Sequence, residues 1–365
     1  FLNKKNLINV IFFSFFTALL INSRILGLLP VFIFSFIYIY NFLNNKQKFI
    51  AERKNIFLYF IFSILFIYIF WPFLWNNPFN NIFVALSDVL KTQEGITIIN
   101  FYFGKYIASD MMPWHYRLVW FFVTTPLIIL LLFLGGITIS INKSFQLLIL
   151  SLNNKFHLST KEFTDIFFIS IILLSFFIFA EFNKSQYGGW RHLYFIYPLV
   201  IYFSLGLVNI IMKKTSNLYK YILFIFIFLN LSYNLYWSIK YHPHQYVFFN
   251  LISKHYAKKN FDLDWWGISH KSSLEYILKD SGKDQIKVFT EGFSSLQNTY
   301  LFLDEKSKKK ISIVFDLNDA DYIIDSKMKR VRVNNILNKL STFNLIYELN
   351  VDGQPVNGIY KKIGG

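Results

Sequence analysis

The stretch that decides the fold is LYFIYPLVIYFSLGLVNIIM, residues 193–212, in which no side chain is charged. An α-helix needs about 20 predominantly apolar residues to cross the hydrocarbon core of a bilayer. Other stretches share this character, and together they give seven predicted spans: Leu7–Asn22, Ile25–Phe42, Ile56–Trp75, Leu118–Ile139, Phe163–Phe182, Leu193–Met212 and Tyr219–Ile239. The sequence therefore predicts an α-helical polytopic membrane protein.

The composition agrees with lipid as the solvent of most of the chain. Charged residues make up 16% of the sequence, whereas soluble domains carry about 25%. A net charge of +16 would suggest a nucleic-acid partner in a soluble protein. Here the lysines and arginines form short clusters between apolar runs, so we expect membrane lipids and no nucleic acid as partners. The absence of cysteine excludes disulfides, thiolate metal sites and cysteine nucleophiles.

The basic clusters predict the orientation of the chain. They lie at Lys4–Lys5, Lys46–Lys54, Lys143–Lys155 and Lys213–Lys220. With seven spans all four fall on one side, and the excess of Lys and Arg in short loops marks that side as cytoplasmic. The loops Asn76–Tyr116 and Asn183–Arg191 and the C-terminus then lie on the other side. We expect a bacterial inner (plasma) membrane protein whose C-terminal domain is extracytoplasmic.

Two domains are predicted, a transmembrane helical bundle at 1–240 and a soluble extracytoplasmic domain at 241–365. The loop at 76–116 contains apolar residues at helical spacing from Ile82 to Leu90, which predicts an amphipathic helix at the membrane surface. The soluble domain has an α/β or α+β pattern. Its predicted elements are a helix at Ser272–Lys279, strands at Ile286–Thr290, Ile311–Phe315 and Tyr322–Ile324, and a hairpin of Asn344–Asn350 with Gly358–Lys362 around Asp352–Gly353.

Three cationic side chains are candidates for binding a phosphate on the extracytoplasmic side. Arg24 lies in the tight turn between the first two spans, and Arg191 and His192 open the sixth span after Tyr187-Gly188-Gly189-Trp190. A guanidinium binds phosphate oxygens bidentately, and a helix N-terminus adds backbone N–H donors. The alternative is that these residues are interfacial anchors that fix the topology.

Other polar residues give weaker signals. The carboxylates Asp88, Glu94, Asp110 and Glu181 have no partner at a telling spacing, so the sequence identifies no catalytic residue. His242 and His244 flank Pro243 without a third metal ligand, and we expect no metal there. The cationic segment from Lys105 to Arg117 fits either an anionic headgroup or interfacial packing. Thr124-Thr125-Pro126 predicts a kink inside the fourth span.

Several of these segments carry a resemblance to a known family. They are Asn22-Ser23-Arg24-Ile25-Leu26-Gly27-Leu28, Trp71-Pro72-Phe73-Leu74-Trp75-Asn76-Asn77-Pro78, Pro113-Trp114-His115-Tyr116, Gly189-Trp190-Arg191-His192 and Tyr241-His242-Pro243-His244-Gln245-Tyr246. In these segments the chain resembles the GT-C superfamily of polytopic glycosyltransferases, in particular its protein mannosyltransferase-like group that depends on polyprenyl-phosphate sugars.

The resemblance implies transfer of a sugar from a polyprenyl-phosphate donor to an extracytoplasmic acceptor, a protein or a lipid, as in protein glycosylation. It implies no cofactor and leaves open a divalent metal ion. The family's catalytic acid lies in an acidic motif of the first extracytoplasmic loop, which no stretch here matches, so we expect that loop upstream of Phe1. Arg24, Arg191 and His192 carry over as candidates for the donor phosphate.

Two other functions remain open at this point. A flippase or a polymerase-type partner would handle lipid-linked glycans through the same basic residues without forming a bond. A transporter would bury ionisable residues or broken helices at mid-membrane. The predicted spans carry almost no charge in their middle, which favours the transferase.

Overall fold

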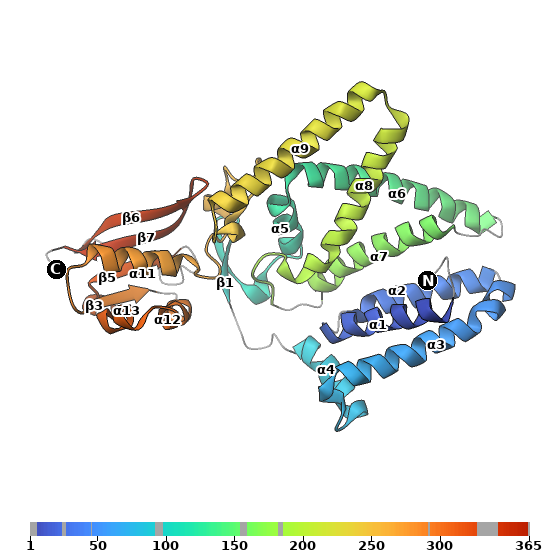
Figure 1. Cartoon of the computed structure of the whole chain (residues 1–365), viewed down its shortest axis with the longest axis horizontal. Helices are drawn as coiled ribbons and strands as arrows, with labels where there is room; N and C mark the ends of the chain where they lie inside the picture. Colours follow the sequence, from blue (N-terminus) through green and yellow to red (C-terminus); the bar gives the residue numbers. More distant parts are fainter. Residues whose placement is uncertain are drawn as a thin grey trace. The chain divides into compact units, whose positions relative to one another are not determined.

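A computed structural model describes residues 6–23, 27–44, 46–91, 98–153, 159–181, 185–290, 293–326 and 342–363. The fold is mostly helical, with a β-sheet region near the C-terminus (Figure 1). The chain divides into two compact units, each built from separate segments. We call Phe1–Ile96, Leu131–Lys184 and Arg191–Lys214 the helical unit, and Thr97–Leu130, Ser185–Trp190 and Thr215–Gly365 the mixed unit.

Among the described residues, five helices are long and apolar enough to cross a membrane, at Arg53–Phe70, Leu127–Leu147, Lys161–Glu181, Arg191–Lys214 and Asn217–Lys240. The predicted number of seven spans is therefore not confirmed. The helices at the first two predicted spans, α1 (Leu7–Ser23) and α2 (Leu28–Asn44), are apolar but only 17 residues long. Ile25, predicted to open the second span, lies outside the described residues.

The fourth predicted span, Leu118–Ile139, is wrong as a continuous helix. It is split into α5 (Tyr116–Thr124) and α6 (Leu127–Asn153), with Thr125 in an extended conformation between them. Pro126 causes the break, because it has no N–H to donate and disfavours helical backbone at the residue before it. The predicted kink is thus a full interruption, and only the part from Leu127 onward has the length of a span.

The helical unit packs its apolar helices through side-chain and close backbone contacts. In α1, the Ser14 hydroxyl donates to the Tyr59 carbonyl of α3 (Lys46–Phe70) at 3.1 Å. Ile33 of α2 forms a buried cluster with Phe163 and Ile171 of α7 (Thr160–Glu181). Gly136 of α6 lies against the Phe203 carbonyl of α8 (Tyr197–Lys214), so no larger residue fits at this crossing.

The helical unit also contains the predicted amphipathic helix, as α4 (Pro78–Lys91) after the short 3₁₀ turn η2 (Pro72–Leu74). Phe79 and Phe83 of α4 are strongly exposed, at 81% and 71%. Large apolar side chains facing outward on one helix are typical of a surface that contacts lipid or another protein.

The mixed unit begins with a hairpin that the sequence analysis did not predict. Strands β1 (Ile99–Tyr102) and β2 (Lys105–Ala108) pair antiparallel around Phe103 and Gly104, which both have positive φ. Two central residues with positive φ are what a tight two-residue hairpin turn requires. The unit also contains η3 (Ser109–Met111), α5, α9 (Asn217–Lys240), η5 (Gln245–Val247) and α10 (Ala257–Asn260).

The C-terminal region is a five-stranded mixed sheet of order β4-β3-β5-β7-β6. Its strands are β3 (Ile286–Thr290), β4 (Ile311–Ile313), β5 (Tyr322–Ser326), β6 (Phe343–Val351) and β7 (Gln354–Lys362). The pairs β3–β4 and β3–β5 are parallel, and the others are antiparallel. The predicted strands and the hairpin around Asp352–Gly353 are confirmed.

Both faces of this sheet are covered, which explains why the consecutive residues Tyr322, Ile323 and Ile324 of β5 are all buried. Tyr322 and Ile324 face a core shared with Leu274 and Ile277 of α11 (Ser269–Asp280), the predicted helix. Ile323 faces the opposite cluster beside η6 (Leu317–Asp319). Two further helices, α12 (Phe293–Leu301) and α13 (Glu305–Lys310), were not predicted.

Asn250 is the residue that satisfies the backbone freed at the Pro126 break. Its Nδ2 donates to the Phe122 carbonyl at 2.7 Å and to the Thr125 carbonyl at 3.1 Å, and its backbone N–H donates to Val123 at 2.9 Å. Ser253 Oγ also donates to Val123, at 2.7 Å. A loop more than 120 residues away in sequence thus caps α5.

We expect Asn250→Ala to destabilise the mixed unit, because it leaves buried carbonyls at the end of α5 without donors. The cost should be about 1–3 kcal/mol, seen as a lower midpoint of thermal unfolding followed by tryptophan fluorescence in detergent. Asn250→Asp should cost at least as much, since it sets a carboxylate oxygen against two carbonyls. Asn344→Ala, at an exposed position of β6, is the control. Equal midpoints for Asn250→Ala and the control would contradict this role.

Candidate functional site

Of the three residues predicted to bind the donor phosphate, the structure describes two. Arg24 lies outside the described residues. Arg191 and His192 lie together at the start of η4 (Arg191–Ile196), where Arg191 Nε donates to His192 Nε2 at 3.2 Å. The His192 ring stacks on Phe179 of α7, with centroids 6.3 Å apart. The two side chains of this Arg191–His192 pair are partly exposed.

Two details of the pair differ from the prediction. An imidazole that accepts a hydrogen bond from a guanidinium is neutral, so the pair carries one positive charge and not two. In addition, Arg191 opens a six-residue 3₁₀ helix, and the α-helix proper begins only at Tyr197. Pro198 is pre-organised for the first turn of an α-helix, which accounts for the later start. An α-helix N-terminus therefore does not supply N–H donors at Arg191.

The glycine-containing segment before this pair is a structural anchor in the mixed unit. Gly189 N–H donates to the Tyr116 hydroxyl at 3.1 Å, and Trp190 Nε1 donates to Thr124 Oγ1 at 2.8 Å. Gly189 has a φ of +68°, and a Cβ there would lie 3.4 Å from the Trp120 ring. Trp120 and Trp190 are both buried in this packing.

The same segment is bonded to the β1–β2 hairpin region. Ser185 Oγ donates to Ser109 Oγ at 2.7 Å, and Gln186 N–H donates to the Ser109 carbonyl at 2.7 Å. Asn100 Nδ2 donates to the Gln186 carbonyl at 3.3 Å. All four side chains are buried. Two loops that the charge pattern assigns to one side of the membrane are therefore joined.

Asp262 connects the hairpin to the C-terminal region, and the sequence analysis missed it. Both of its carboxylate oxygens lie 3.1 Å from the Phe101 N–H, which donates to them. Burial, followed by the negative charge of Asp262, raises the pKa of the Tyr116 hydroxyl. Tyr116 therefore stays protonated at neutral pH.

A second missed carboxylate, Asp264, is the centre of a buried polar network. Tyr246 OH donates to its Oδ1 at 2.6 Å, and Ser269 Oγ donates to its Oδ2. Asn357 Nδ2 in turn donates to Ser269 Oγ at 2.6 Å. Burial raises the pKa of the Asp264 carboxyl. Since Asp264, Ser269 and Asn357 have no exposed surface, this network connects parts of the fold and cannot contact a substrate.

His244 ends this network. Its Nδ1 lies 3.3 Å from the Tyr246 hydroxyl, and because the tyrosine proton is given to Asp264, His244 must be the donor. His242 Nδ1 is within 2.9 Å of Gln245 Nε2. Among the described residues, no group of three or more His, Cys, Asp or Glu side chains is placed to hold a metal ion.

The carboxylates weighed as candidate bases are not brought together. Asp110 and Glu181 are exposed, Asp88 lies in α4, and Glu94 lies outside the described residues. A different acid, Asp165 of α7, is buried in the helical unit. It accepts from Tyr202 OH of α8 at 2.6 Å, and Ser140 Oγ of α6 lies 3.5 Å away.

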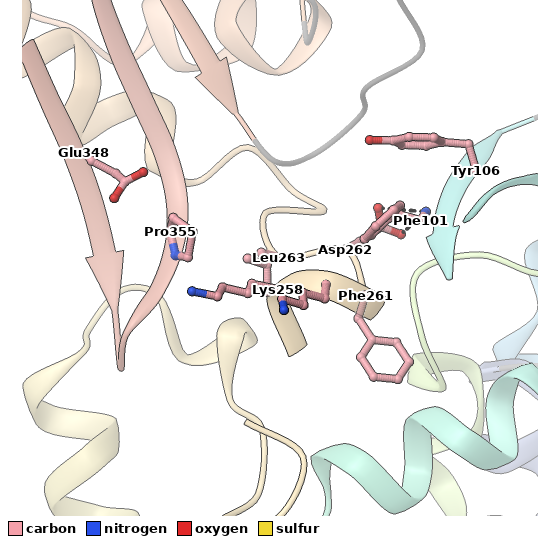
Figure 2. A pocket seen from close by; sticks show the side chains of 9 residues that line it. Phe101, Tyr106, Lys258, Phe261, Asp262, Leu263, Glu348 and Pro355 are labelled. Carbon is pink, nitrogen blue, oxygen red and sulfur yellow. Dashed lines mark hydrogen bonds between the residues drawn. The ribbon is translucent and has the colours of Figure 1, made fainter. Parts of the chain in front are cut away.

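An open cleft of about 270 Å³ lies in the mixed unit. It is lined by Phe101, Tyr106, Lys258, Lys259, Phe261, Asp262, Leu263, Glu348 and Pro355. Figure 2 shows Glu348 and Pro355 on two neighbouring strands, with Phe101 and Tyr106 on the other side of the cleft. Aromatic, cationic and carboxylate groups thus converge in one concave surface, as small-molecule sites require.

No protein-family model, curated protein or solved structure matches the chain. The fold alone defines the class of the protein: it is mostly helical, and several of its helices are able to span a membrane.

We expect the pH dependence of stability to report on His244. Burial, followed by repulsion from His242, lowers the pKa of His244 below its ordinary value of 6.5. Its contribution is therefore present above pH 6.5 and is lost as the pH falls through the folded-state pKa, by at most about 1.4 kcal/mol per pH unit. His244→Asn retains a donor without titrating, so its unfolding midpoint should fall less than that of the wild type between about pH 7.5 and 5.

His255→Asn is the matched control, because the His255 side chain is exposed. It should follow the wild-type pH profile. If the His244→Asn profile were also the same as the wild type, His244 would not be the group whose protonation destabilises the fold.

Proposed function

We propose that this chain belongs to an integral-membrane glycosyltransferase and supplies its donor-binding part. That enzyme moves a sugar from a polyprenyl-phosphate donor to an extracytoplasmic acceptor, a protein or a lipid. The observation that carries the proposal is the Arg191–His192 pair at the start of the candidate span Arg191–Lys214. The resemblance of Gly189-Trp190-Arg191-His192 to the GT-C glycosyltransferases gives this pair its proposed ligand, the phosphate of the donor.

A charged side chain at the edge of the hydrocarbon region of a membrane raises the free energy of the protein. That cost reaches a few kcal/mol with depth, and an anionic partner offsets it. His192 accepts from Arg191 Nε and so fixes the plane of the guanidinium. A guanidinium whose plane is fixed loses less entropy when its nitrogens bind two oxygens of a phosphodiester. A lipid phosphate that diffuses laterally in the membrane would reach Arg191, because both groups would lie at the same depth, near the membrane surface.

The topology required for this reaction is supported by contacts within the mixed unit. Segments of the loops Asn76–Tyr116 and Asn183–Arg191 are bonded through Ser109 and Gln186. The hairpin in the first of these loops is bonded to the C-terminal region through Phe101 and Asp262. Segments in direct contact outside the spans share one side of the membrane. The positive-inside rule applied to the basic clusters makes that side extracytoplasmic.

The topology predicts that a reporter fused after Gly365 lies outside the cytoplasm. Alkaline phosphatase in that position should be active, and a fluorescent protein that matures only in the cytoplasm should stay dark. A fusion after Lys214, on the opposite side of α9, is the internal control and should give the reverse result. A fluorescent signal after Gly365 would mean that the orientation is inverted.

The role of Arg191 is tested by donor binding to the purified chain in detergent. Arg191→Ala should weaken binding of a polyprenyl-phosphate sugar by roughly ten- to a hundredfold, the value of one charge-assisted hydrogen bond. Arg191→Lys should fall between this variant and the wild type, because an ammonium keeps the charge but not the two-pronged geometry.

Arg53→Ala, on an exposed arginine of α3, is the matched control and should bind the donor normally. Unfolding midpoints of all variants are measured first. Wild-type affinity in a folded Arg191→Ala protein would reduce Arg191 to a topology anchor.

A transporter is the second candidate, and Asp165 is the observation that favours it. Asp165 is 6% exposed and lies within a candidate span, and its carboxylate is contacted from α6 and α8. Ionisable residues inside spans commonly belong to ion or proton pathways. Donor binding separates the two functions, because a transporter of this kind has no need to recognise a polyprenyl phosphate through Arg191.

A further inference from the structure

The cleft of the mixed unit is not used by the donor-phosphate pair, and it has the features of a separate binding site. Its walls come from the β1–β2 hairpin, the segment Lys258–Leu263 and the β6–β7 hairpin. These three parts are far apart in sequence. The ligand that the cleft accepts follows from how the walls are fixed and from the groups they present.

Hydrogen bonds between the three walls hold them in place. The hairpin is fixed to the segment by the Asp262–Phe101 bond, drawn as a dashed line in Figure 2, and by an isolated bridge between Tyr102 and Phe261. The segment is fixed to β7 by Gln354, whose Oε1 accepts from Lys258 N–H at 3.1 Å. Gln354 Nε2 also donates to the Lys254 carbonyl at 2.6 Å. A pre-organised cleft loses little entropy on binding.

The charged groups of the cleft have both signs. The side chains of Lys258 and Lys259 are exposed, and their ammonium groups form no ion pair with any acid in the part of the chain that the structure describes. Asp262 and Glu348 supply carboxylates, and Glu348 accepts from Asn350 at 3.1 Å. A cleft lined by two cations and two carboxylates disfavours a polyanion such as nucleic acid and favours a ligand with one anionic group and several hydroxyls.

The aromatic residues complete this description. The rings of Phe101 and Tyr106 form a tilted pair with centroids 5.0 Å apart, and Tyr106 is 45% exposed. A sugar ring has an apolar face of C–H groups surrounded by hydroxyls. Such a face packs on an aromatic ring while the hydroxyls donate to carboxylates. The volume of about 270 Å³ is just below the usual lower limit for small-molecule sites, about 300 Å³.

We propose that this cleft binds an anionic sugar, a hexose unit that carries a carboxylate or a phosphate. The anionic substituent contacts Lys258 and Lys259, the ring packs on Tyr106, and hydroxyls donate to Glu348. That this sugar belongs to the acceptor rests on the proposed transferase function. The binding itself does not depend on it.

The test is equilibrium binding to the full chain in detergent with four probes, namely a galacturonic acid trisaccharide, glucose 6-phosphate, neutral maltotriose and inorganic phosphate. At least one charged sugar should bind ten times more tightly than both maltotriose and inorganic phosphate. The better charged probe identifies the substituent as carboxylate or phosphate. Lys258→Ala combined with Lys259→Ala should weaken that probe by roughly ten- to a hundredfold.

Two comparisons keep the result specific. Lys306→Ala combined with Lys309→Ala, at exposed lysines of α13, should leave binding unchanged. Tyr106→Ala should weaken all sugar probes, and Tyr106→Phe should not. Equal binding of the charged sugars and inorganic phosphate, or no effect of the Lys258 and Lys259 changes, would overturn the proposal.

Donor binding measured on the same preparations separates this inference from the proposed function. If the chain binds the charged sugar but not the polyprenyl-phosphate donor, the cleft remains a sugar site and the proposed transferase function is refuted. A chain that binds the donor while the cleft variants behave as wild type refutes the cleft.

Discussion

The interruption at Thr125–Pro126 is the constraint on which the mixed unit depends. A proline in the middle of an apolar run leaves backbone carbonyls without helical donors, and buried carbonyls without donors are costly. Asn250 and Ser253 supply those donors to Phe122, Val123 and Thr125. Two side chains of α5 bind the segment before Arg191: the Tyr116 hydroxyl accepts from Gly189 N–H, and Thr124 Oγ1 accepts from Trp190 Nε1. The break and its cap therefore bring together α5, the segment before Arg191, and the chain that leads into the sheet.

The features that the sequence predicted well are those fixed by local patterns. Long uncharged runs became helices at the expected places, with ends shifted by a few residues, as in α7 and α9. The turn at Asp352–Gly353 was predicted because these residues tolerate the positive φ that the structure has there. The count of seven spans was not confirmed, because α1 and α2 are only 17 residues long. The break at Pro126 shifted the start of the fourth predicted span to Leu127, because a hydropathy pattern continues through Pro126 although the helix does not.

The features that the sequence did not reveal depend on partners distant in the chain. Nothing in the sequence distinguishes Asp262 and Asp264 from other acidic residues. Their hydrogen bonds to Phe101 and Tyr246 form only in the folded chain. The sequence around Asn250 gives no sign of a special role. Its side-chain and backbone N–H groups cap the end of α5, which is more than 120 residues away in the sequence. Of the candidate site, the neighbours Arg191 and His192 were predictable, since both lie in one motif. That His192 accepts from Arg191, and so adds no second charge, required coordinates. The environment of Asp165 likewise depends on a distant residue, Tyr202, whose hydroxyl donates to its carboxylate.

The distant cap on α5 has a consequence for biosynthesis. Asn250 follows Phe122 by 128 residues, and translation at about 5–20 residues per second separates them by roughly 6 to 26 seconds. During that interval four of the five candidate spans, Leu127–Leu147, Lys161–Glu181, Arg191–Lys214 and Asn217–Lys240, are synthesised. The end of α5 must meanwhile be satisfied by water, by lipid headgroups or by the insertion machinery. The nascent chain thus holds an unfinished helix at the membrane until its last span has been made, and a chaperone acting on that interval would meet α5 before any part of the sheet exists.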